Sequence, residues 1–124
     1  MVSGQEDKFG KKNDKGKLRM DLIPPEVEEA LAEVLTHGAE KYDDRNWEKG
    51  IKYSRVYAAL RRHLLAWMKG EKIDSEWGLN HLAHAYCCLA FLLTYEMRNM
   101  GEKWDDLHKR EEPKGGDIVW KEDL

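Results

Sequence analysis

The stretch Trp77-Gly-Leu-Asn-His-Leu-Ala-His-Ala-Tyr-Cys-Cys-Leu-Ala-Phe-Leu-Leu-Thr-Tyr95 is apolar around most of a helical circumference. A helix of that kind is usually central in a bundle, so the stretch predicts an all-α fold. One stripe recurs at helical spacing and predicts a buried face, formed by Leu79, Leu82, Ala83, Tyr86, Leu89, Ala90 and Leu93. A second stripe carries His81, His84, Cys88, Phe91 and Tyr95.

Two histidines on this helix need partners. His81 and His84 are three residues apart, so both imidazoles project from the same side. Burying a titratable ring costs free energy unless it is hydrogen-bonded. The rings either bond to a neighbouring helix or line a polar pocket inside the bundle. His63 falls on the inward stripe of the preceding helix, and we therefore expect the three histidines to form an interior cluster.

Three main helices are predicted, over 25–41, 54–69 and 75–99. Pro25 suits a first helical turn, Ser54 is a plausible N-cap, and Asp74 or Ser75 is expected to cap the third helix. We therefore divide the chain into a flexible basic arm (1–20), a helical domain (21–100) and a loosely packed charged tail (101–124). The sequence thus predicts a compact helical bundle with a flexible arm and tail.

The composition and charge of the chain limit the classes of partner that it is expected to bind. The 124 residues carry a net charge of −3, which argues against general binding to nucleic acid polymers. No apolar run reaches the ~18 residues of a membrane span, and the N-terminus lacks a signal peptide core, so a cytoplasmic protein is expected. Three amphipathic helices in a short chain leave apolar surface to cover, which favours a homodimer or homotetramer.

Two segments carry residues suited to a nucleotide. Lys17 and Arg19 alternate, so in an extended arm they face the same way and could clamp a phosphate, or they belong to a solvated basic tail. The loop after the first helix combines cations, aromatic rings and an amide. It offers a stacking surface, a base-edge reader and phosphate contacts through Lys41, Tyr42, Arg45, Asn46 and Trp47. Tyr42 and Trp47 could equally anchor this loop on the bundle.

Acidic side chains suggest a metal. Glu33, His37 and Glu40 are spaced i, i+4, i+7 and form one row on the first helix. Carboxylates suit magnesium or manganese, although acidic rows are also common solvated faces. Asp74 and Glu76 lie near the start of the third helix, where they could bind a metal or complement the helix dipole.

Four ordered motifs, at 17–25, 38–47, 62–71 and 81–84, are similar to the N-terminal domain of phage dATP/dGTP diphosphohydrolases. The resemblance covers roughly residues 15–95. That family is related to the all-α MazG-like pyrophosphohydrolases, which cleave between the α and β phosphates with magnesium held by acidic residues. Arg62 and the pair His81 and His84 stand where the MazG-like acids would be. The resemblance therefore implies metal ligands from elsewhere, namely Glu33, Glu40, Asp74 and Glu76.

Three functions follow as alternatives. The first is a pyrophosphohydrolase of purine deoxynucleoside triphosphates with Mg²⁺ or Mn²⁺ as cofactor, in the cytoplasm of the infected host. Its expected catalytic residues are Glu33, His63, His81 and His84. Its phosphate ligands would be Lys17, Arg19, Lys41 and Arg62, with Trp47 stacked on the base. The second is a binding protein that sequesters a nucleotide or a nucleotide-based host defence signal without hydrolysis. The third is a structural helical protein.

Overall fold

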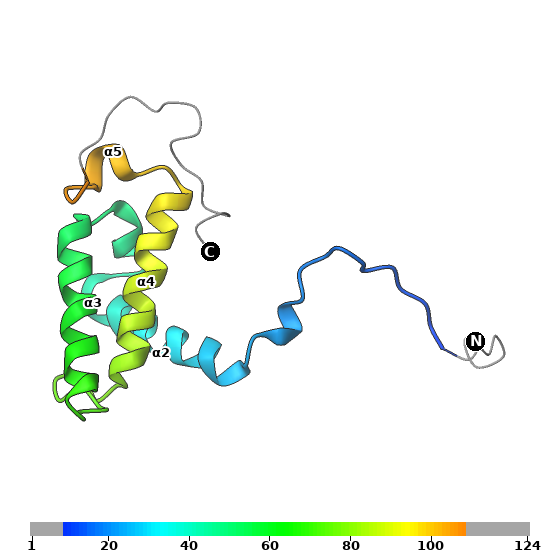
Figure 1. The fold of residues 1–124 in the computed structure, drawn as a ribbon, viewed down its shortest axis with the longest axis horizontal. Coiled ribbons are helices and arrows are strands. Elements are labelled where there is room, and N and C mark those ends of the chain that lie inside the picture. Colours follow the sequence, from blue (N-terminus) through cyan, green and yellow to red (C-terminus); the bar gives the residue numbers. More distant parts are fainter. Residues whose placement is uncertain (1–8, 109–124) are drawn as a thin grey trace.

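The structure is a computed structural model that describes residues 9–108, and it confirms an all-α fold with three main helices (Figure 1). They are α2 (Pro25–Tyr42), α3 (Tyr53–Met68) and α4 (His81–Met97). The short helix η1 (Met20–Leu22) precedes α2, η2 (Asn46–Lys49) lies between α2 and α3, and α5 (Gly101–Trp104) follows α4. Between residues 9 and 108 no helix is both long and apolar enough to cross a membrane.

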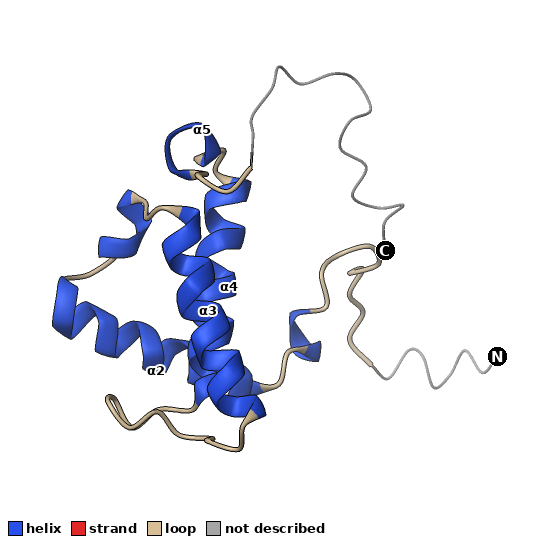
Figure 2. Cartoon of the chain, turned by 60° about the vertical axis from the view of Figure 1, so that its left-hand side comes forward, coloured by secondary structure: helices blue, strands red, loops and turns tan. Residues whose placement is uncertain are grey.

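Helix α4 is central, as its sequence predicts. It runs antiparallel to α3 and also packs against α2 (Figures 1 and 2). Two apolar clusters hold the helices together. One joins α2 to α4 through Val34, Leu79 and Cys87, and the other joins α3 to α4 through Tyr53, Val56 and Tyr95.

The third helix begins six residues later than predicted, at His81 rather than at residue 75. The Asp74 carboxylate accepts hydrogen bonds from the backbone N–H groups of Glu76 (3.2 Å) and Trp77 (2.9 Å), which closes a turn instead of capping a helix. Gly78 follows with a φ of +73°, which a helix does not allow. The N-cap is Asn80, whose side chain accepts from the N–H groups of the first helical turn.

The predicted buried stripe of α4 is only partly buried: Leu79, just before the helix, is 6% exposed as expected, but the leucines within the helix lie on an exposed side. Leu82, Leu89 and Leu93 are 41%, 52% and 60% exposed, whereas His81, His84 and Tyr95 are buried. Both α2 and α3 pack on the histidine side of α4, so its leucine side has no cover among the described residues.

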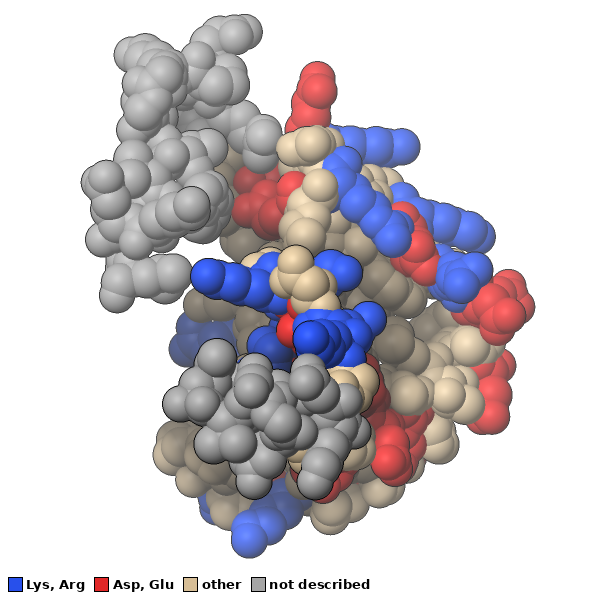
Figure 3. Space-filling view, turned by 90° about the vertical axis from the view of Figure 1, so that its right-hand side faces the viewer, with Lys and Arg blue, Asp and Glu red and all other residues tan. Residues whose placement is uncertain are grey.

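The structure describes part of the chain on either side of the bundle. Residues 9–20 are exposed and extend away from the helices (Figures 1 and 2). Figure 3 views the molecule from the side toward which this arm extends, and Lys and Arg side chains gather near the centre of that view. Residues 101–108 dock on the bundle, because Asp106 accepts from the Ser54 N–H at 2.8 Å and from the Ser54 hydroxyl. Residues 1–8 and 109–124, which hold the rest of the expected arm and tail, lie outside the described residues.

Candidate functional site

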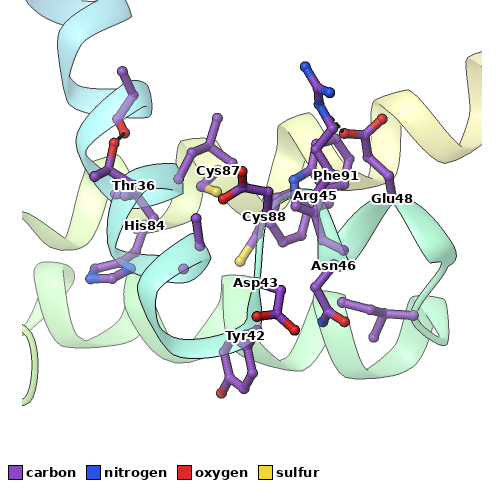
Figure 4. Close-up of a pocket in the computed structure, with 18 of the residues that line it drawn as sticks. Thr36, Tyr42, Asp43, Arg45, Asn46, Glu48, His84, Cys87, Cys88 and Phe91 are labelled. Carbon is purple, nitrogen blue, oxygen red and sulfur yellow. Dashed lines mark hydrogen bonds and ion pairs between the residues drawn. The ribbon is translucent and has the colours of Figure 1, made fainter.

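A cavity of about 790 Å³ lies between α2, the segment 43–51 and α4 (Figure 4). Its volume is within the ~300–1,000 Å³ of small-molecule sites. Aromatic, aliphatic and thiol groups form its apolar wall, among them Trp47, Ile51, Trp77, Cys87, Cys88 and Phe91. Polar groups from α2, the loop and α4 complete the lining, among them Thr36, Tyr42, Asp43, Asp44, Arg45, Asn46, Glu48 and His84.

The loop that borders the cavity is held in an unusual backbone conformation. Asp43 and Arg45 have φ values of +86° and +56°, a region that costs non-glycine residues energy. Trp47 fixes the loop, because its ring stacks on Phe91 at 4.3 Å and its carbonyl accepts from the Tyr95 hydroxyl at 2.6 Å. Of the two interpretations of Trp47, the structure thus places it as an anchor, with its ring also in the cavity wall.

The charged part of the cavity lining is acidic. Asp43, Asp44 and Glu48 line the cavity with a single cation, Arg45. The Arg45 guanidinium lies 3.3 Å from Glu48, which also accepts from Arg98 at 2.7 Å. The cavity by itself therefore suits a base and a sugar better than a chain of phosphates.

The three histidines meet behind this cavity, which confirms the expected interior cluster. His63 and His81 share a hydrogen bond between their Nδ1 atoms at 2.9 Å, and the His63 ring stacks on His84 at 4.4 Å. A carboxylate lies at each end of the cluster. Glu71 Oε2 is 3.6 Å from His81 Nε2, and Asp74 Oδ2 is 3.5 Å from His84 Nε2.

Burial keeps His63 and His84 neutral near pH 7. Desolvation, reinforced by the neighbouring imidazoles, lowers the pKa of His63 to about 4. Desolvation also lowers the pKa of His84, although Asp74 opposes the shift. The Nε2 atoms of His81 and His84 are buried without a hydrogen-bond partner. Such a group costs about 1–3 kcal/mol and requires an explanation, for which a catalytic role is one candidate.

The carboxylates determine which ring nitrogens carry protons. Each unpartnered Nε2 faces a carboxylate, which favours a hydrogen on that atom. The neutral His84 ring then has Nδ1 as its proton acceptor. His84 belongs to both the cluster and the cavity lining.

Five of the predicted site residues line the cavity: Tyr42, Arg45, Asn46, Trp47 and His84. The other predicted phosphate ligands lie apart from it. Lys41 is next to the wall, 5.4 Å from the Trp77 ring centre, and Arg62 is exposed on α3. Lys17 and Arg19 are on the projecting arm, where Arg19 pairs with Asp21 at 2.7 Å.

The predicted metal ligands do not come together. Glu33 and Glu40 are exposed on α2, and Glu76 lies 3.9 Å from the Lys41 ammonium. Asp74 is occupied by its turn and by His84. Among residues 9–108 no three His, Cys, Asp or Glu side chains are placed to hold a metal ion. Mg²⁺ is usually held by one or two carboxylates together with water and substrate phosphates, so binding of the magnesium that the resemblance implies stays a prediction.

Several lining residues were not predicted from the sequence. Asp43 and Asp44 adjoin the predicted loop residues, and that adjacency was their only signal. No feature of the sequence pointed to a cavity role for Trp77, Cys87 and Phe91, because their apolar side chains are typical of the buried core around a long helix. Burial raises the pKa of Cys87 to about 12 and that of Cys88 to about 11, so these thiols contribute shape rather than reactivity.

Residues 7–106 match the family model described as dATP/dGTP diphosphohydrolase, N-terminal. The chain is also 42% identical over 83 residues to a dATP/dGTP diphosphohydrolase of Salmonella phage PMBT28. That alignment covers 67% of this chain and 28% of the relative, so the chain spans less than a third of the relative's length. No solved structure matches the chain.

Proposed function

Because this chain belongs to the family of dATP/dGTP diphosphohydrolase N-terminal domains, we propose that it binds a purine deoxynucleoside triphosphate for hydrolysis to the monophosphate and pyrophosphate. The phage relative supplies the nucleotide class through its name. The observation that carries the proposal is a nucleotide-sized cavity with aromatic walls and a buried, neutral histidine in its lining.

The base would occupy the apolar part of the cavity. Phe91 and Trp77 provide flat apolar surface there, and Trp47 is held against Phe91. Stacking of a base on an aromatic ring contributes about 1–3 kcal/mol. The Asn46 amide offers both a donor and an acceptor at the loop, so it is the group best suited to read a purine edge.

His84 would take up the proton that hydrolysis releases. As water attacks the α phosphorus, the bond to the bridging oxygen breaks, pyrophosphate leaves, and the water proton passes to His84 Nδ1. Asp74 would orient the ring and stabilise the imidazolium, which is the role of a carboxylate behind a catalytic histidine. His63 and His81 would hold His84 in place by stacking and hydrogen bonding. Dependence on Mg²⁺ or Mn²⁺ stays a prediction, and no step here passes through a metal.

Binding without hydrolysis is the second candidate, and one observation favours it. Among residues 9–108 no three His, Cys, Asp or Glu side chains are placed to hold a metal ion. In that case the same cavity would sequester a nucleotide.

A paired measurement tests both candidates. Binding is measured by calorimetry with dATP, dGTP, dCTP and dTTP, and pyrophosphate release is measured on the same samples with Mg²⁺ or with chelator. We expect tighter binding of the purine nucleotides, and a loss of at least 100-fold in pyrophosphate release in His84→Gln with binding retained. His108→Gln is the matched control, since His108 is exposed and pairs with Asp105 away from the cavity. Purine binding without pyrophosphate release would select the sequestering function, and absence of purine binding would overturn both.

A further inference from the structure

One side of the α3–α4 hairpin exposes large apolar side chains. We define the outer α3–α4 face by six residues that are between 37% and 66% exposed: Tyr57, Leu64 and Met68 of α3, and Leu82, Leu89 and Leu93 of α4. The three on α3 recur at spacings of seven and four residues, and the three on α4 at seven and four, so each set forms one stripe.

The two stripes lie on the same side of the hairpin. Tyr57 follows the buried Val56 by one residue, and Leu82 follows the buried His81 by one residue. In antiparallel helices, positions displaced in the same direction from the contact stripe flank the same side of the pair. The stripes therefore join into one surface.

Helix α2 covers the opposite side. Val34 of α2 packs with Cys87 of α4, and Cys87 also lines the cavity. Cys87 and Leu89 are two residues apart, so their side chains point about 160° apart around the helix. The outer face is thus turned away from the cavity, and no element among residues 9–108 covers it.

We propose that this face binds a second copy of the same chain in a two-fold symmetric dimer. Six side chains with these exposures offer several hundred Å² of apolar surface, comparable to the ~800 Å² that each partner contributes to a standard interface. A contiguous apolar patch of that size marks an interaction site on a soluble protein. The dimer would place α3 and α4 of both copies in a central four-helix bundle, with α2 and the cavity on the outside.

Charge also favours a second copy over a charged partner. Arg61, one turn after Tyr57 on α3, is a charged residue in contact with the face. Arg61 donates a hydrogen bond to the Tyr57 hydroxyl at 2.7 Å, and its guanidinium lies 5.5 Å from the centre of that ring. Two such faces meet without a dominant like-charge repulsion, and arginine and tyrosine are both enriched at interfaces.

Sedimentation equilibrium tests the proposal. The unaltered chain should sediment at twice its 14.5 kDa mass at micromolar concentration. Leu89→Glu should weaken association at least 100-fold while the helical circular dichroism is retained. Leu22→Glu is the control, because Leu22 is 67% exposed on η1, away from the face.

A second variant guards against a folding defect. If Leu89→Glu loses helical signal, Leu93→Ser, a milder change at a residue that is 60% exposed, should show the same loss of association. A monomeric unaltered chain at 100 μM, as expected if another segment of the chain covers the face, would overturn the proposal. A dimer that survives both substitutions would overturn it as well.

Discussion

Gly50 allows a direct test of how the segment after α4 is held on the bundle. Its φ is +111°, and a Cβ atom built at this position would overlap the indole of Trp104. Gly50→Ala therefore combines two costs. The backbone strain is about 1–3 kcal/mol. Displacing Trp104 from the cluster around Tyr53 and Tyr95 adds a part of the ~3–5 kcal/mol typical of removing a core tryptophan.

Together these costs amount to about 3–5 kcal/mol. At ~4 °C of melting temperature per kcal/mol, the Gly50→Ala variant should melt at least ~12 °C below the unaltered chain. Thermal unfolding followed by circular dichroism measures the difference.

Two other glycines separate the contributions. Gly70 has a φ of +103° with no atom within 4 Å of an added Cβ, so Gly70→Ala should show the strain alone. Gly38 lies inside α2 with equal space, and Gly38→Ala should stabilise by about 0.5–1 kcal/mol. When Trp104 is replaced by alanine, the further loss of melting temperature caused by Gly50→Ala should be no larger than the loss caused by Gly70→Ala. Equal melting temperatures for the Gly50 and Gly70 variants in the presence of Trp104 would refute the reasoning.

Three further outcomes follow from the described contacts. Because the pKa of His63 is lowered in the folded chain, the unfolded chain takes up its proton at a higher pH. The free energy of unfolding should therefore have its full value above pH 6.5 and decrease as the pH falls to about 4. Melting curves of His63→Gln should show a smaller decrease. Asn80→Ala removes the N-cap of α4 and should cost about 1 kcal/mol by denaturant titration, whereas Asn13→Ala on the arm should cost nothing measurable. Replacing Lys17 and Arg19 by alanine should weaken nucleotide binding and reduce its salt dependence in calorimetry, without lowering the melting temperature. An unchanged affinity would show that the arm is a solvated basic tail.

The sequence predicted two helices closely because their ends carry strong local signals. Pro25 fixes the start of α2, and Lys69-Gly70 marks the end of α3, so both helices were placed to within a residue. The start of α4 was misplaced because Asp74 is equally suited to cap a helix and to close a turn. Which of the two Asp74 does depends on Gly78, which interrupts the helix, and on Asn80, which caps the helix six residues after Asp74.

Periodicity could not decide which side of α4 is buried. Both stripes of that helix are apolar enough to pack, and the difference lies in where α2 and α3 dock. The same limit applies to the site. The loop from Tyr42 to Trp47 was found through its residue types, and the histidine cluster through the inward position of His63. The wall formed by Trp77, Cys87 and Phe91 exists only once α2 is placed across α4.

Asp74 also has a consequence for how binding can be observed. One of its oxygens accepts from the Trp77 N–H at 2.9 Å and also lies 3.5 Å from His84. A ligand that draws a proton onto His84 strengthens the attraction between the imidazolium and this carboxylate. The carboxylate and the backbone of residues 74–77 are thereby pulled toward α4 as one unit. Hydrogen exchange at the Trp77 amide would then report the protonation state of a side chain seven residues away.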